Sequence, residues 1–139
     1  MYDGCVLPPN YARMLYVTSY SNIPSVAYAI YRGYYGMACV PFMVFLSSVL
    51  YWYKPDYSWR RTLDITVVQV ALVINLIIAA YAENGITYYI TTLVAVLFYE
   101  AGKMVYIRGM LLQSTTAHVC LHIIANIANV ILYSGRIAI

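Results

Sequence analysis

The hydrophobic residues of this chain lie in long, nearly continuous blocks rather than in the alternating or one-sided patterns of soluble strands and helices. Five blocks contain about 20 residues, the length that an α-helix needs to cross a hydrocarbon core of about 30 Å. Glycine, proline and charged residues separate the blocks. The pattern predicts an all-α, polytopic membrane helix bundle, a single domain over residues 1–139, with helices at approximately 11–31, 34–53, 62–82, 86–106 and 114–133.

The fourth block is less uniform than the others. Glu100, Gly102 and Lys103 interrupt its last third. This block can therefore also be read as a shorter helix followed by a turn at the membrane interface. A bundle of four transmembrane helices is the alternative.

Composition supports the membrane prediction. Of the 139 residues, 63% are apolar and 9% are charged, whereas soluble domains have roughly 45–50% and about 25%. So few charges exclude a soluble globular domain. The net charge of +3 is spread between the apolar blocks without a basic run, so we expect no nucleic-acid partner.

The basic residues predict an orientation. With five helices, one side of the membrane carries Arg13, Lys54, Arg60, Arg61, Lys103 and Arg108. The other side carries Arg32 and Arg136. Because cytoplasmic loops carry the excess of lysine and arginine, we expect a cytoplasmic N-terminus and a C-terminus on the opposite side.

The last block has polar residues on one helical face. His118 and His122 are four residues apart, so their imidazoles project from successive turns on the same side. Such a pair can share a metal ion or a proton relay, and ionisable residues at membrane depth usually face the bundle interior. The pair can also serve helix packing alone, through hydrogen bonds across the bundle.

A second polar set comes at the junction of the second and third blocks. Ser47 and Ser48 lie near the end of the second block, and Asp64 opens the third. In the five-helix arrangement these residues share a leaflet with the two histidines and with Glu100. Hydroxyl, carboxylate and imidazole groups at one depth are the components of a metal site or an acid–base cluster.

Local ion pairs are a simpler account of the two carboxylates. Arg60 and Arg61 precede Asp64 by four and three residues, and Lys103 follows Glu100 by three. These spacings bring opposite charges together on a helix surface. The ion pairs and the functional assignment therefore both stay open.

Three features together resemble a known family. They are a serine near the end of an early helix, an aspartate that opens the next helix, and H-x-x-x-H in the last helix; Ser21-Asn22 in the first helix is also similar. The pattern resembles the alkaline-ceramidase-like superfamily of membrane hydrolases, in which three histidines hold zinc while serine and aspartate assist a zinc-bound water that attacks a lipid amide. The resemblance implies zinc ligands at His118 and His122, the orienting carboxylate at Asp64, and the assisting hydroxyl at Ser47 or Ser48.

The chain departs from this family in two respects. The family has seven transmembrane helices, and its serine is followed four residues later by the third zinc histidine, where this chain has Tyr51 after Ser47 or Trp52 after Ser48. A zinc ion here would need Asp64 or Glu100 as its third protein ligand. Residues 48–64 also resemble uncharacterised small membrane proteins of giant DNA viruses, a likeness that implies no chemistry.

The sequence thus leads to a membrane protein with a polar histidine–aspartate cluster and three functional hypotheses. The first is a reduced relative of the metal-dependent lipid-amide hydrolases, either active with zinc or limited to binding. The second is a structural protein of a viral or organellar inner membrane, working as an oligomer or in a larger assembly. The third is a small channel. Membrane lipids, including a lipid-amide substrate, are the expected partners.

Overall fold

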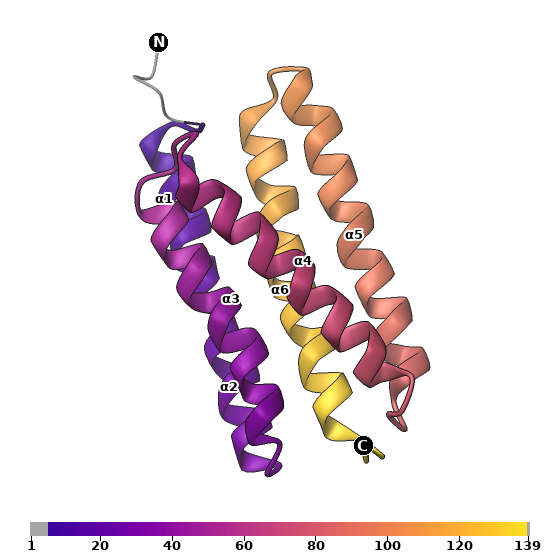
Figure 1. Ribbon diagram of the computed structural model, residues 1–139. Coiled ribbons are helices and arrows are strands. Elements are labelled where there is room, and N and C mark those ends of the chain that lie inside the picture. Colours follow the sequence, from indigo (N-terminus) through magenta and orange to yellow (C-terminus); the bar gives the residue numbers. More distant parts are fainter. Residues whose placement is uncertain (1–5, 139) are drawn as a thin grey trace.

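The computed structural model describes residues 6–138, which form a bundle of α-helices with no β-sheet in that part of the chain (Figure 1). The helices are α1 (Pro9–Ser19), α2 (Asn22–Tyr31), α3 (Tyr35–Tyr53), α4 (Trp59–Ala79), α5 (Gly85–Ile107) and α6 (Leu111–Ser134). The last four are long and apolar enough to cross a membrane. The predicted all-α membrane bundle is confirmed, and the chain is a multi-pass membrane protein.

The first predicted helix, 11–31, is divided into α1 and α2. At the break, the amides of Tyr20 and Ser21 bond to carbonyl oxygens three residues back, at 3.1 and 3.0 Å. Pro24 explains the break, because a proline ring clashes with the carbonyl four residues earlier, here that of Tyr20, and offers no N–H. Two shorter helices, which follow one another along α3 (Figure 1), therefore replace the single predicted one.

The fourth predicted helix is intact. α5 runs through Glu100, Gly102 and Lys103 without interruption. The two charges form an ion pair of 3.1 Å between Lys103 Nζ and Glu100 Oε2, which confirms the predicted local pairing. This helix is one of the four that can cross a membrane, so the alternative in which it stops short is not supported.

Two glycines set the path of α5. At Gly85, where α5 begins, a Cβ would lie 2.0 Å from the carbonyl oxygen of Ala79 at the end of α4. At Gly102, near the other end, a Cβ would lie 3.3 Å from Ala117 Cβ on α6. α5 therefore starts close to the end of α4, and it packs along α6 from its start, where Asn84 bonds to Ile131 and Ser134, to its end. Figure 1 shows α4 and α5 diverging from their shared turn.

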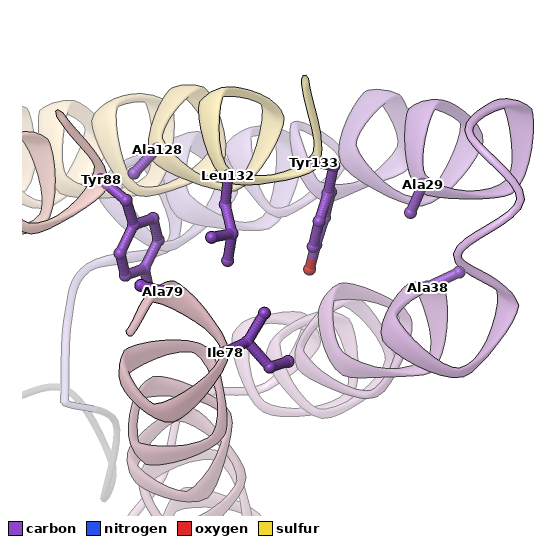
Figure 2. Close-up of a cluster of buried hydrophobic side chains, with 8 residues drawn as sticks. All are labelled: Ala29, Ala38, Ile78, Ala79, Tyr88, Ala128, Leu132 and Tyr133. Atoms are coloured by element: carbon purple, nitrogen blue, oxygen red, sulfur yellow. The ribbon is translucent and has the colours of Figure 1, made fainter. Parts of the chain in front are cut away.

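A cluster of buried apolar side chains lies inside the bundle, at the end where α4 turns into α5 (Figure 2). Its buried members are Ala29, Ala38, Ile78, Ala79, Tyr88, Ala128, Leu132 and Tyr133. Four alanines let the helix backbones approach closely, as is usual in membrane bundles. The Tyr133 hydroxyl donates to the Met37 carbonyl at 3.5 Å, the carbonyl that Pro41 leaves without its helical donor.

Polar residues of α6 tie neighbouring helices to it. Asn126 accepts a hydrogen bond of 2.9 Å from Ser25 and donates one of 3.1 Å to Ser21. One turn further, Asn129 accepts from Asn75 of α4 at 3.0 Å. The polar face predicted for the last block thus points into the bundle, where each such bond is worth about 0.6 kcal/mol and up to about 1.7 kcal/mol.

The candidate residues gather at one end of the bundle. The starts of α1, α4 and α6 and the ends of α3 and α5 lie together there (Figure 1). Ser47, Ser48, Asp64 and Glu100 lie within about two turns of the helix ends there, whereas His118 lies two turns and His122 three turns into α6. The common depth of these residues stays a prediction.

We predict that Gly85→Ala destabilises the bundle by about 1–3 kcal/mol, because the added methyl group would overlap the Ala79 carbonyl and force the α4–α5 turn apart. The matched control is Gly36→Ala in α3, where a Cβ meets nothing within 4 Å. We expect the control to be neutral or slightly stabilising. Helicity followed during unfolding in mixed detergent micelles measures both, and equal stability of the two variants would contradict the packing account.

Candidate functional site

A cavity of about 340 Å³ opens at the end of the bundle that carries the candidate residues. Its walls come from α1, α3, α4, α5 and α6 and are mainly apolar and aromatic. The polar side chains of the wall are Tyr51, Trp52, Arg61, Asp64, Tyr99, Lys103, Tyr106, Ser114, Thr115 and His118. A concave apolar wall with a few polar groups is the usual form of a small-molecule site, and the volume falls in the usual range.

The exposed wall residues show where the cavity opens. Every exposed residue of its wall belongs to α4 or α5, such as Ile65, Phe98 and Tyr99, whereas the wall residues from α1, α3 and α6 are buried or half-buried. This is the side on which α4 and α5 diverge (Figure 1). In a bundle that crosses a membrane, an opening between two helices faces the lipid.

Asp64 is held in the cavity wall by two serines. It is 8% exposed, and the hydroxyls of Ser47 and Ser48 both donate to its Oδ1 at 2.8 Å. The arrangement follows from local sequence: Ser58 caps the start of α4, which puts Asp64 on the second turn, facing the adjacent serines of α3. The predicted association of these three residues is therefore present.

The predicted ion pair of Asp64 with the preceding arginines does not form. Arg60 instead pairs with Asp56, Nη2 to Oδ2 at 2.6 Å, and Arg61 lies over the ring of Tyr57 at 5.6 Å. The Ser58 hydroxyl and the Arg60 guanidinium lower the pKa of Asp56 below its usual value. The ion-pair account of Asp64 is wrong, because the arginine side chains extend toward the loop.

One oxygen of Asp64 is left for a ligand. Both serines bond to Oδ1, and Oδ2 accepts no hydrogen bond from any residue between 6 and 138. Because Asp64 lines the cavity, Oδ2 can accept a hydrogen bond from a bound molecule.

The two histidines contact each other edge to face. Their ring centroids are 4.9 Å apart and their planes meet at 74°. His118 lines the cavity, between Trp52 at 5.4 Å and Tyr99 at 6.4 Å between ring centroids. His122 lies one turn deeper and is not part of the cavity wall.

A threonine of α1 orients His122. Thr18 Oγ1 lies 3.1 Å from His122 Nδ1 and also donates to the Leu15 carbonyl at 3.2 Å. The donor in this bond depends on the imidazole tautomer; in the tautomer with a proton on Nδ1, Thr18 accepts the hydrogen bond and the Nε2 lone pair is available to a metal or a proton.

The residues do not form a complete metal site. Among residues 6–138, no three His, Cys, Asp or Glu side chains are grouped closely enough to hold a metal ion. Glu100 is engaged with Lys103, has a half-exposed side chain and is not part of the cavity wall. Zinc ligation by His118, His122, Asp64 and Glu100 stays a prediction, and we derive no reaction step from it.

Several wall residues were not predicted as site residues. Tyr51 and Trp52 take the place of the family's third histidine, and both are buried in the wall. Trp52 Nε1 and Thr115 Oγ1 are buried without a hydrogen-bond partner in the described part of the chain. Thr115 shares the helical face of His118, a signal that the sequence does contain. Unsatisfied donors beside a cavity favour a bound polar molecule or water.

Comparison of the chain with protein-family models, with curated proteins and with solved structures gives no match. The resemblance to the ceramidase-like hydrolases therefore rests on the residues described above and on nothing else.

We predict strong thermodynamic coupling between Asp64 and its two serines. Asp64→Ala removes the only protein partner of the Ser48 hydroxyl within the described residues, and a buried hydroxyl left unpaired costs about 1–3 kcal/mol. When Ser47 and Ser48 are also replaced by alanine, the loss should be smaller than the sum of the separate losses by about 0.5–3 kcal/mol. Unfolding free energies in mixed micelles measure this cycle.

The control for that cycle is Thr66→Ala, an exposed α4 residue outside the cavity wall. Its effect should add to that of Ser47→Ala and Ser48→Ala within about 0.5 kcal/mol. If the stability loss of Asp64→Ala also simply added to those of Ser47→Ala and Ser48→Ala, the three residues would not act as one cluster.

Proposed function

We propose that this membrane protein binds a lipid amide in the cavity, with the polar part of the lipid at Asp64 and His118. The observation that carries the proposal is the cavity itself, which joins a carboxylate oxygen without a protein donor to aromatic walls and opens between two membrane helices. We also propose that this end of the bundle faces the cytoplasm, because six of the eight lysines and arginines belong to it.

A lipid amide matches the hydrogen-bonding groups of the wall. Its N–H, or a hydroxyl beside it, can donate to Asp64 Oδ2. Its carbonyl oxygen can accept from Trp52 Nε1 or from the Thr115 hydroxyl, the two buried donors that lack partners in the described chain.

The hydrocarbon chains of such a lipid match the remaining wall. Leu15, Ile65 and Phe98 line the cavity, and the last two are exposed at the opening. A lipid can therefore enter from the bilayer between α4 and α5 and leave its chains in the hydrocarbon. Burial of apolar surface is not needed to drive entry, because the chains stay in an apolar solvent throughout.

Hydrolysis of the bound amide is the second candidate function. The neighbouring imidazoles and the Thr18 bond that orients His122 favour it. His118 and His122 would supply two of the three protein ligands that a catalytic zinc ion takes, so hydrolysis needs a third ligand in addition to these imidazoles. Asp64 and its two serines would position the amide.

Lipid binding predicts selectivity for an amide over an ester. In maltoside micelles, ceramide should raise the melting temperature of the wild-type protein more than diacylglycerol does, because ceramide has an amide N–H donor in addition to its hydroxyls, whereas diacylglycerol has a single hydroxyl. Asp64→Asn replaces one acceptor oxygen of Asp64 by an NH2 donor and should weaken ceramide binding about tenfold or more. Thr66→Ala, outside the wall, should bind as the wild type does.

Equal binding of ceramide and diacylglycerol, together with no effect of Asp64→Asn, would refute the proposed function. The unfolding free energy of each variant, measured alongside, separates weaker binding from incomplete folding. If Asp64 had a purely structural role, Asp64→Asn would lower the unfolding free energy without changing the binding of ceramide relative to diacylglycerol.

Hydrolysis predicts a bound metal. Protein purified without chelators should contain about one zinc per chain, and His118→Ala combined with His122→Ala should remove it. Turnover of ceramide should then depend on zinc. Metal at background level in the wild type would reject the hydrolase and leave lipid binding untouched.

A further inference from the structure

The mouth of the cavity carries a cation that no acidic residue of the described chain neutralises. Arg60 is paired with Asp56, but Arg61 forms no ion pair with any residue between 6 and 138; it is exposed and lines the cavity. Its guanidinium lies over the Tyr57 ring at 5.6 Å. An arginine without an acidic partner matches a phosphate or a carboxylate.

A second cation stands on the other side of the opening. Lys103 of α5 lines the cavity, with Nζ 5.2 Å from the centre of the Tyr99 ring. Its partner is Glu100 at 3.1 Å, and both side chains are more than half exposed, at 54% and 53%. Exposed pairs of this kind are worth about 0–1 kcal/mol, so Lys103 can exchange Glu100 for a stronger anion.

The two cations lie nearer the membrane surface than the groups assigned to the amide. With a rise of about 1.5 Å per residue, Arg61 is about 3 Å from the start of α4 and Asp64 about 8 Å. By the same measure Lys103 is about 6 Å from the end of α5 and His118 about 10 Å from the start of α6. The polar groups of a membrane lipid follow the same order of depth, because its phosphate lies at the interface and its backbone amide or ester lies several ångströms deeper.

We propose that Arg61 and Lys103 bind the phosphoryl group of the lipid that occupies the cavity, across the opening between α4 and α5. The ligand is then a phosphorylated lipid amide rather than a neutral one. This inference rests on the proposed function for the amide, and on the two cations for the phosphate. An anionic headgroup is also expected on this side of the membrane if it is cytoplasmic, because anionic lipids concentrate there.

Four lipids test the two halves of the assignment separately. Ceramide and ceramide phosphate have the amide, whereas diacylglycerol and phosphatidic acid have an ester, and the second member of each pair has the phosphate. Binding is measured by native mass spectrometry in maltoside micelles, which contain neither group. We expect ceramide phosphate to bind about tenfold or more tightly than ceramide.

Arg61→Gln and Lys103→Gln should each reduce that preference for phosphate several-fold and leave ceramide binding unchanged. Arg108→Gln is the matched control, because it removes one positive charge from the same end of α5 without touching the cavity wall. Helical content and unfolding free energy are compared for all variants. An equal loss in Arg108→Gln would overturn the site, since the preference would then reflect general charge.

The remaining outcomes separate the proposals. Equal binding of ceramide and ceramide phosphate overturns the phosphoryl site and leaves the proposed function standing. Preference for both phosphorylated lipids without preference for the amide supports the phosphoryl site and overturns the proposed function. Binding of none of the four overturns both. Displacement of ceramide phosphate by millimolar inorganic phosphate would assign the cations to free phosphate and overturn the lipid assignment.

Discussion

Every polar group that this chain places at membrane depth must find its hydrogen-bond partner inside the protein, because hydrocarbon offers none. α6 meets this constraint with a face of asparagines whose partners come from α2 and α4. That face fixes which side of α6 lies inward and which helices surround it. Four buried side-chain atoms of the described residues have no hydrogen-bond partner: Trp52 Nε1 and Thr115 Oγ1 in the cavity wall, Asn75 Oδ1 in α4 and Asp56 Oδ1 in the loop before α4. The two in the wall, beside an Asp64 oxygen that accepts no hydrogen bond from residues 6–138, favour a ligand in the cavity.

The sequence was sufficient to predict the all-α membrane bundle, its last four long helices and the inward polar face of the last helix. Depth follows from the position along a helix, so the association of Asp64 with Ser47 and Ser48 could be expected. Direction around the helix axis is harder to predict. Glu100 has the expected depth, but it lies on the exposed side of α5 beside Lys103. Which side faces a neighbour depends on how the helices cross, and one sequence does not give this.

Two other features of the fold could not be predicted from the pattern of apolar blocks. Pro24 divides the first predicted helix into α1 and α2. The steric clash of the proline ring explains the break, but the hydropathy of the segment does not indicate it. Gly85 allows the start of α5 to lie against the end of α4, and Gly102 allows its last third to lie close to α6. Both residues are ordinary in a membrane helix, so the sequence does not show that these positions need a glycine.

The functional hypotheses differ in whether they require the opening between α4 and α5. A hydrolase must first admit a lipid and hold its amide beside the imidazoles, so hydrolysis requires everything that binding requires, and a metal in addition. A structural protein needs the asparagine bonds of α6 but not a gap between α4 and α5, nor a carboxylate oxygen without a protein donor. Because a bundle selected for packing alone would close such a gap to gain contacts, the gap itself favours binding over a structural role. Binding is then the common premise, and the metal decides whether chemistry follows it.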